Sequence, residues 1–68
     1  NMPKIVEKNP KVLGGTPVIR GTRIPVSRIM ALIGMEYKLA NLKKEYPRLK
    51  NFTKNDFEEM LHYYGAHI

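Results

Sequence analysis

The segment at residues 17–25, with the sequence PVIRGTRIP, constrains the fold of this chain more than any other. Two stretches prone to β structure flank a central Gly-Thr pair, and a glycine in the first central position suits a two-residue type II′ hairpin turn. In that register Arg20 lies opposite Arg23. Ile19 then lies opposite Ile24. Because proline cannot donate a main-chain hydrogen bond, the prolines at both ends predict a short ribbon rather than part of a large sheet.

The facing arginines of this hairpin suggest a binding role. Like charges placed directly opposite each other destabilise a hairpin, so the Arg20–Arg23 pair is easier to explain if it holds an anion. That anion could be a phosphate or the carboxylate of a partner. The alternative is that both side chains extend into water, and the residues alone leave the three possibilities open.

A two-stranded ribbon is marginal alone and must pack on helices or on a second copy. The chain has 68 residues and no cysteine, so it has room for one core and no disulfide. A core of this size supplies roughly 3–5 kcal/mol. We therefore expect a homodimer formed through the hairpin, which would cover exposed strand edges and bury further apolar area.

The first two helices are predicted from apolar spacing. One stripe follows the i, i+3, i+4, i+7 pattern, with Gly34 as its C-terminal stop. Its members are Val26, Ile29, Met30 and Ile33. A narrower stripe of Leu39, Leu42 and Tyr46 predicts a short second helix that ends before Pro47. The start of this second helix stays open between residues 35 and 42.

The third helix has both a start signal and an apolar face. Thr53 and Asp56 form a Thr-x-x-Asp start, a relative of the capping box. The apolar positions that follow are interpreted as core rather than as a ligand-binding box. They are Phe57, Met60, Leu61 and Tyr64.

These elements predict one α+β domain, mainly α, that spans residues 2–68. A β-hairpin arm occupies residues 4–25, and a three-helix bundle occupies residues 26–66. Asn1, ahead of Met2, is interpreted as a remnant that precedes the initiator. With no long apolar run and no signal segment, we expect a soluble cytoplasmic protein without a membrane partner.

The charge is distributed unevenly along the chain. Twelve Lys and Arg oppose six Asp and Glu, which gives a net charge of +6. Residues 1–54 hold all twelve cations and three glutamates, for +9, and residues 55–68 hold three acids, for −3. This asymmetry suggests a polyanionic partner for the first part and another role for the last helix. The alternative is that the charge only keeps a small protein soluble.

No catalytic or metal-binding pattern emerges from the sequence. Ser27 is the only serine and has no evident His and acid partners for a hydrolytic triad. His62 and His67 would fall about 140° apart around a helix and could not share a metal. Asp56 and Glu59 could share a divalent ion, but such a pair usually forms a solvated face. We expect no enzyme activity, no cofactor and no metal.

The segment LGGTPVIRGTRIPV at residues 13–26 resembles the signature of the domain-of-unknown-function family DUF433, and the likeness continues through Tyr46-Pro47 and residues 53–64. The resemblance implies a homeodomain-like or winged helix-turn-helix fold. It also implies a role as antitoxin beside a PIN-like toxin, because many members are encoded next to such a protein. The chain departs from the family at residues 35–42, where a Pro-Glu-Glu helix start is usual and Glu36-Tyr37-Lys38-Leu39 stands here.

Two functions from different classes follow. A DNA-binding regulator of its own promoter region would use basic side chains as phosphate contacts, mainly from the hairpin and the second helix. These side chains are Arg20, Arg23, Lys38, Lys43, Lys44, Arg48 and Lys50. The alternative is a protein-binding module that neutralises a PIN-like nuclease through its folded surface or through the acidic residues Asp56, Glu58 and Glu59. Those acids would repel phosphates, so the third helix is not expected to enter a DNA groove.

Overall fold

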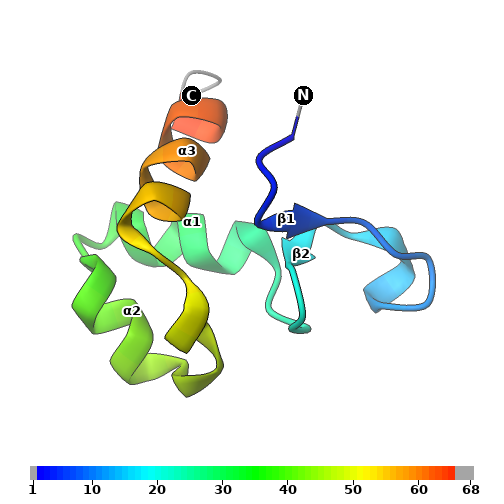
Figure 1. Ribbon diagram of the computed structural model, residues 1–68, viewed down its shortest axis with the longest axis horizontal. Helices are drawn as coiled ribbons and strands as arrows, with labels where there is room; N and C mark the ends of the chain where they lie inside the picture. Colours follow the sequence, from blue (N-terminus) through cyan, green and yellow to red (C-terminus); the bar gives the residue numbers. More distant parts are fainter. Residues whose placement is uncertain (1, 66–68) are drawn as a thin grey trace.

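A computed structural model of the chain describes residues 2–65 and shows a small sheet followed by three helices (Figure 1). Strands β1 (Val6–Glu7) and β2 (Val18–Ile19) pair antiparallel. The helices are α1 (Val26–Gly34), α2 (Leu39–Glu45) and α3 (Lys54–Gly65). The predicted α+β class, mainly α, is confirmed. Asn1 and His67, which entered the sequence interpretation, lie outside the described residues.

The two-stranded sheet joins different segments from those predicted. β2 pairs with β1, where Val6 lies opposite Ile19. The expected partner segment contributes a single bridge, between Val18 and Pro25. That bridge keeps the predicted register, and the N–H of Ile19 donates to the carbonyl of Ile24 over 3.0 Å. On the other side of Pro25 the N–H of Val26 donates to the carbonyl of Pro17 over 3.0 Å, and pairing ends there because α1 begins at Val26.

The tight turn lies one residue earlier than predicted. The N–H of Thr22 donates to the carbonyl of Ile19 over 2.9 Å, so Arg20 and Gly21 are its central residues. Gly21 has a φ of +80°, and a glycine at this position is typical of a type II turn. Thr22 is buried, and its Oγ1 donates to Ile19 O over 2.7 Å and accepts from Ile24 N over 3.1 Å. The Thr22 hydroxyl thus pairs two main-chain groups, Ile19 O and Ile24 N, at the end of the short β-ladder.

The connection between β1 and β2 projects away from the helices (Figure 1). The side chain of Asn9 accepts the N–H of Lys11 over 2.9 Å, and the 3₁₀ segment η1 (Leu13–Gly15) follows. Leu13 has a φ of +48° and a side chain that is 49% exposed. A left-handed conformation at a residue other than glycine costs stability.

The end of α1 differs from the prediction. Gly34 was expected to stop the helix, but it is the last helical residue, and the left-handed residue is Glu36, with a φ of +69°. The helix continues through Gly34 because its last carbonyls are bonded by residues beyond the glycine. The N–H of Glu36 donates to Ile33 O over 2.9 Å, and the N–H of Tyr37 donates to Leu32 O over 3.0 Å. This is the Schellman arrangement.

The start of the second helix, which the sequence left open between residues 35 and 42, lies at Leu39. The N–H of Lys38 donates to Oδ1 of Asn41 over 2.9 Å, which satisfies a main-chain donor ahead of α2. Pro47 ends this helix as predicted and begins a 3₁₀ segment, η2 (Pro47–Asn51). At α3 the predicted start is confirmed: Thr53 N donates to Asp56 Oδ2 over 3.0 Å, and Asp56 N donates to Thr53 Oγ1 over 3.1 Å.

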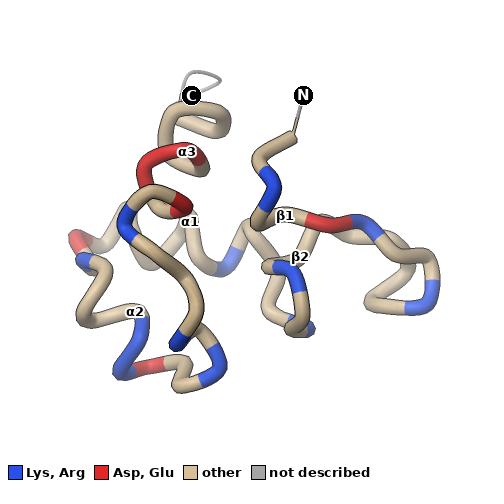
Figure 2. The backbone as a smooth tube through the Cα atoms, viewed as in Figure 1, with Lys and Arg blue, Asp and Glu red and all other residues tan. Residues whose placement is uncertain are grey.

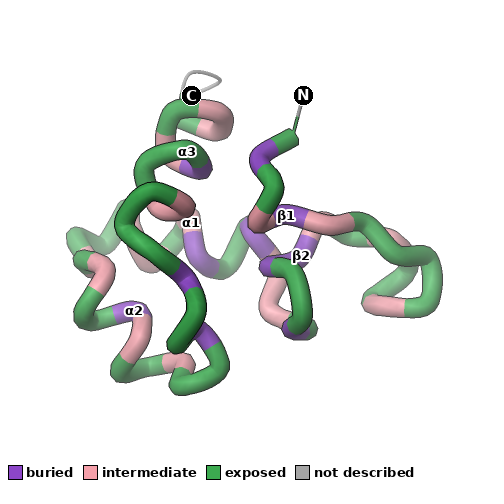
Figure 3. The backbone as a smooth tube through the Cα atoms, viewed as in Figure 1, coloured by how far each residue is buried: buried purple, intermediate pink, exposed green. Residues whose placement is uncertain are grey.

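One hydrophobic core holds these elements together (Figure 3). Its fully buried members come from β1, β2, α1, α2, α3 and the segment that joins α2 to α3. They are Val6, Ile19, Val26, Ile29, Leu42, Leu49, Phe52 and Met60. Phe57 meets Phe52 edge-on with ring centroids 6.3 Å apart. No helix in the described part of the chain is long and apolar enough to cross a membrane.

Candidate nucleic-acid interface

Positive and negative residues are unevenly distributed over the fold (Figure 2). Lysines and arginines predominate on α2, the following segment η2 and the turn after β2, although Glu45 also lies on α2, whereas α3 begins with Lys54 and carries three acids. The predicted phosphate contacts on these segments are exposed, apart from the half-buried Lys43. The fold therefore places Arg20, in the turn after β2, and Arg48, on η2, on neighbouring elements although they lie far apart in the sequence.

The core side of α2 and η2 determines where their cations lie. Leu42 and Leu49 are buried and fix the side of each segment that faces the core. The charged side chains between them lie toward solvent, because an unpaired charge is rarely buried. Lys43 and Lys44 stand in the last turn of α2, where a cation also interacts favourably with the helix dipole. Arg48 and Lys50 are exposed on η2.

Carboxylates limit this basic surface at one end. A groove of about 580 Å³ between the α1–α2 connection and α2 is lined by Lys44 together with Glu36 and Glu45. Two carboxylates beside one ammonium group disfavour a polyanion in this groove. These carboxylates therefore oppose Lys44 in the last turn of α2, whereas Lys38, ahead of the helix, does not line the groove.

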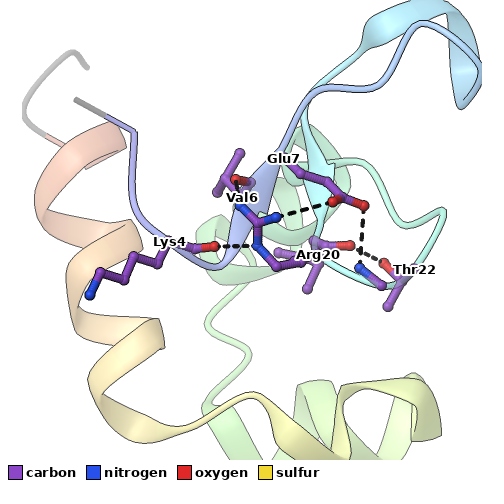
Figure 4. A network of polar contacts seen from close by, with 7 residues as sticks. Lys4, Val6, Glu7, Arg20 and Thr22 are labelled. Carbon is purple, nitrogen blue, oxygen red and sulfur yellow. Dashed lines mark hydrogen bonds and ion pairs between the residues drawn. The ribbon is translucent and has the colours of Figure 1, made fainter.

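The guanidinium of Arg20 is held by the segment that contains β1 (Figure 4). Its Nε donates to the carbonyl of Lys4 over 2.7 Å and its Nη2 donates to the carbonyl of Val6 over 3.2 Å. Its Nη1 donates to Oε1 of Glu7 over 3.3 Å. This carboxylate belongs to the chain itself, whereas the sequence interpretation considered a phosphate or the carboxylate of a partner. Arg23 is exposed, and no side-chain partner is found for it among residues 2–65.

A small hollow brings Arg20 together with Arg48. It has a volume of about 130 Å³ and lies between the turn after β2 and η2. Ile19, Leu49 and Phe52 line it from the core, and Asn51 lines it beside the two arginines. Sequence reasoning proposed both arginines as phosphate contacts but could not place them at one hollow, because their meeting depends on how η2 packs against β2.

The acids of α3 have different surroundings. Asp56 caps the helix through Thr53, so it has a structural role. Glu59 accepts from Nδ2 of Asn55 over 3.0 Å, and Glu58 is exposed. In the described part of the chain, no group of three or more His, Cys, Asp or Glu side chains is placed to hold a metal ion.

An apolar hollow that sequence reasoning missed lies on another side of α1. It measures about 190 Å³ and is lined by Pro17, Val26, Ser27, Met30 and Tyr64. Burial raises the pKa of the Tyr64 hydroxyl above its ordinary value of 10.0, and the neighbouring Tyr63 raises it further. The ring centroids of these two tyrosines lie 4.8 Å apart, and the rings meet edge to face.

Comparisons with known proteins give a family but no activity. A family model described as "Protein of unknown function (DUF433)" matches residues 6–64. The chain is similar to the uncharacterized protein y4eO of Sinorhizobium fredii, with 39% identity over 46 residues. That match covers 68% of this chain and 21% of y4eO, so the chain spans about a fifth of the length of this relative. No solved structure matches the chain.

Proposed function

The chain belongs to the DUF433 family, whose description assigns no activity. From the positive charge on its surface, we propose that it binds the phosphate backbone of DNA as a small regulator. The observation that carries this proposal is the gathering of exposed cations on α2, η2 and the turn after β2. Cations on neighbouring elements can contact successive phosphates of one duplex.

Each element has a defined part in this proposal. Lys43 and Lys44 in the last turn of α2 and Lys50 on η2 contact phosphates as mobile point charges. Arg20 is fixed against β1 and so offers a positioned guanidinium. α3 stays outside the groove, because Glu58 and Glu59 on its surface repel phosphates.

The resemblance to DUF433 adds a biological setting to this proposal. We propose that the protein acts as the antitoxin of a toxin–antitoxin pair and regulates its own promoter region, in the cytoplasm and without enzymatic activity. The second candidate is a module that neutralises a PIN-like nuclease without reading DNA. The exposed carboxylates of Glu58 and Glu59 favour this second candidate, since they offer a surface for a basic partner.

A homodimer also remains a proposal. Pairing through the edge of β1 would have to replace contacts that the chain makes itself. The N–H of Val6 donates to Pro3 O over 3.1 Å, and its carbonyl accepts from Arg20 Nη2. Sedimentation of the protein at tens of micromolar tests the proposal, and a clean monomer would remove it.

The regulator proposal is tested by fluorescence-anisotropy binding of a labelled duplex from the protein's own promoter region, with a scrambled duplex as control. Both duplexes are measured at about 50 and 200 mM salt. We expect preference for the promoter duplex that persists at the higher salt. Equal, weak binding that disappears with salt would contradict a regulator and direct attention to the nuclease partner.

A further inference from the structure

We propose that the hollow between the turn after β2 and η2 is a phosphate-binding site that holds one phosphate group between Arg20 and Arg48. This inference rests on the proposed function, because it names the point at which the DNA backbone is anchored. The two arginines come from segments far apart in the sequence and line the same hollow of about 130 Å³. Paired guanidinium groups are well suited to phosphate oxygens.

The side chain of Arg20 is already positioned for this role. A guanidinium has five N–H donors in a fixed plane, and three of those of Arg20 are used by Lys4 O, Val6 O and Glu7. The other two, one on Nη1 and one on Nη2, have no acceptor within the described residues. Because β1 holds the group in place, binding does not require the loss of rotamer freedom that a free arginine would incur.

Charge balance around the hollow matches a phosphodiester. Glu7 offsets Arg20 through an ion pair of 3.3 Å, and the Glu7 side chain does not line the hollow. Arg48 is exposed and has no side-chain partner within the described residues. One uncompensated positive charge therefore remains at the site, and a backbone phosphate carries one negative charge.

The size and floor of the hollow narrow the class of ligand. Pockets for drug-sized molecules measure roughly 300–1,000 Å³, so a hollow of about 130 Å³ suits a single group rather than a whole cofactor. Its floor contains Leu49 and Phe52, each 1% exposed, so water is excluded from below. An apolar floor strengthens the attraction between the arginines and an anion above it. Asn51 at the side of the hollow offers neutral amide donors.

A matched pair of variants on η2 tests this site. Arg48→Gln and Lys50→Gln each remove one exposed positive charge from the same short segment, but only Arg48 lines the hollow. The probe is inorganic phosphate, titrated at constant ionic strength against chloride, and the readout is the movement of the amide NMR signals of Gly21 and Asn51. The same variants are then measured for duplex binding. Thermal melts check that both fold, and Arg48→Lys retains the charge without the fork of donors.

We expect phosphate to move both amide signals in the wild type and in Lys50→Gln but not in Arg48→Gln. Duplex affinity should fall about tenfold in Arg48→Gln and about twofold to threefold in Lys50→Gln, with Arg48→Lys between them. Equal losses in the two Gln variants, with no phosphate-dependent shift at Gly21 or Asn51, would overturn the site and leave DNA binding intact. Phosphate shifts in a wild type that binds no duplex would support the site, overturn the proposed function and indicate a small phosphorylated ligand.

Discussion

The main-chain N–H of Tyr37 donates to the carbonyl of Leu32 over 3.0 Å, and this bond closes the C-terminal end of α1. The residue between the helix and Tyr37 that must turn left-handed is Glu36, with a φ of +69°. Helices that end in this way usually place glycine at that position, because a side chain there crowds the main chain. Here Gly34, two residues earlier, is the last residue of the helix, so the strain falls on a glutamate.

Glu36→Gly should therefore raise the free energy of unfolding by about 0.5–1 kcal/mol, since glycine adopts this conformation without the steric cost. Urea denaturation measures the change. Gly34→Ala is the matched comparison: a Cβ there meets no atom within 4 Å and its φ is not positive, so alanine should also stabilise, by about 0.5–1 kcal/mol. A loss of stability in Gly34→Ala would show that the helix ends at Gly34 in solution.

The contrast between Gly34 and Asp56 shows what the sequence could predict. The reciprocal hydrogen bonds of Thr53 and Asp56 were predicted because a capping box is a local pattern in which both partners lie within one turn. The end of α1 was misplaced because glycine is a common stop but is not obligatory, and no local pattern marks Glu36 as left-handed.

The contacts that define the candidate site are not local. A long loop separates β1 from β2 in the sequence, and their pairing places the carboxylate of Glu7 beside Arg20. The sequence had instead predicted Arg23 as the neighbour of Arg20. The hollow shared with Arg48 depends further on the packing of η2. Residue type and net charge identified both arginines as candidates, whereas their partners follow from tertiary structure.

Arg20→Lys should lower the free energy of unfolding by about 1 kcal/mol, although it preserves the charge. A single ammonium group cannot reach the carbonyls of Lys4 and Val6 together with the Glu7 carboxylate, which the guanidinium contacts through three different nitrogens. The ion pair itself contributes little of this, because the two side chains are 57% and 29% exposed. Arg23→Lys, with no such contacts, should change stability by less than about 0.5 kcal/mol in the same denaturation assay. Similar losses in both variants would contradict the role of the carbonyl contacts.

Tyr64→Phe should reduce the sensitivity of the fold to alkaline pH. Burial raises the pKa of this hydroxyl in the folded state above its unfolded value of 10.0, so the folded protein disfavours the tyrosinate. A raised pKa contributes stability that is fully present below about pH 10 and is lost as the pH rises through the folded pKa. The difference in unfolding free energy between Tyr64→Phe and the wild type should therefore shift in favour of the variant above about pH 10. A difference that stays constant with pH would contradict the burial of this hydroxyl.

Two double variants distinguish the proposed DNA regulator from the nuclease-binding module. Lys43→Gln with Lys44→Gln removes two of the proposed phosphate contacts, so duplex affinity should fall and the slope of log K against log salt should decrease by about 2. Glu58→Gln with Glu59→Gln removes repulsion on α3 and should leave duplex binding equal or stronger. Anisotropy titrations over a series of salt concentrations measure both, and melting curves account for the Asn55–Glu59 hydrogen bond lost in the second variant. An unchanged salt slope in the lysine variant would mean that α2 does not face the DNA, and loss of nuclease binding in the glutamate variant would assign α3 to the protein partner.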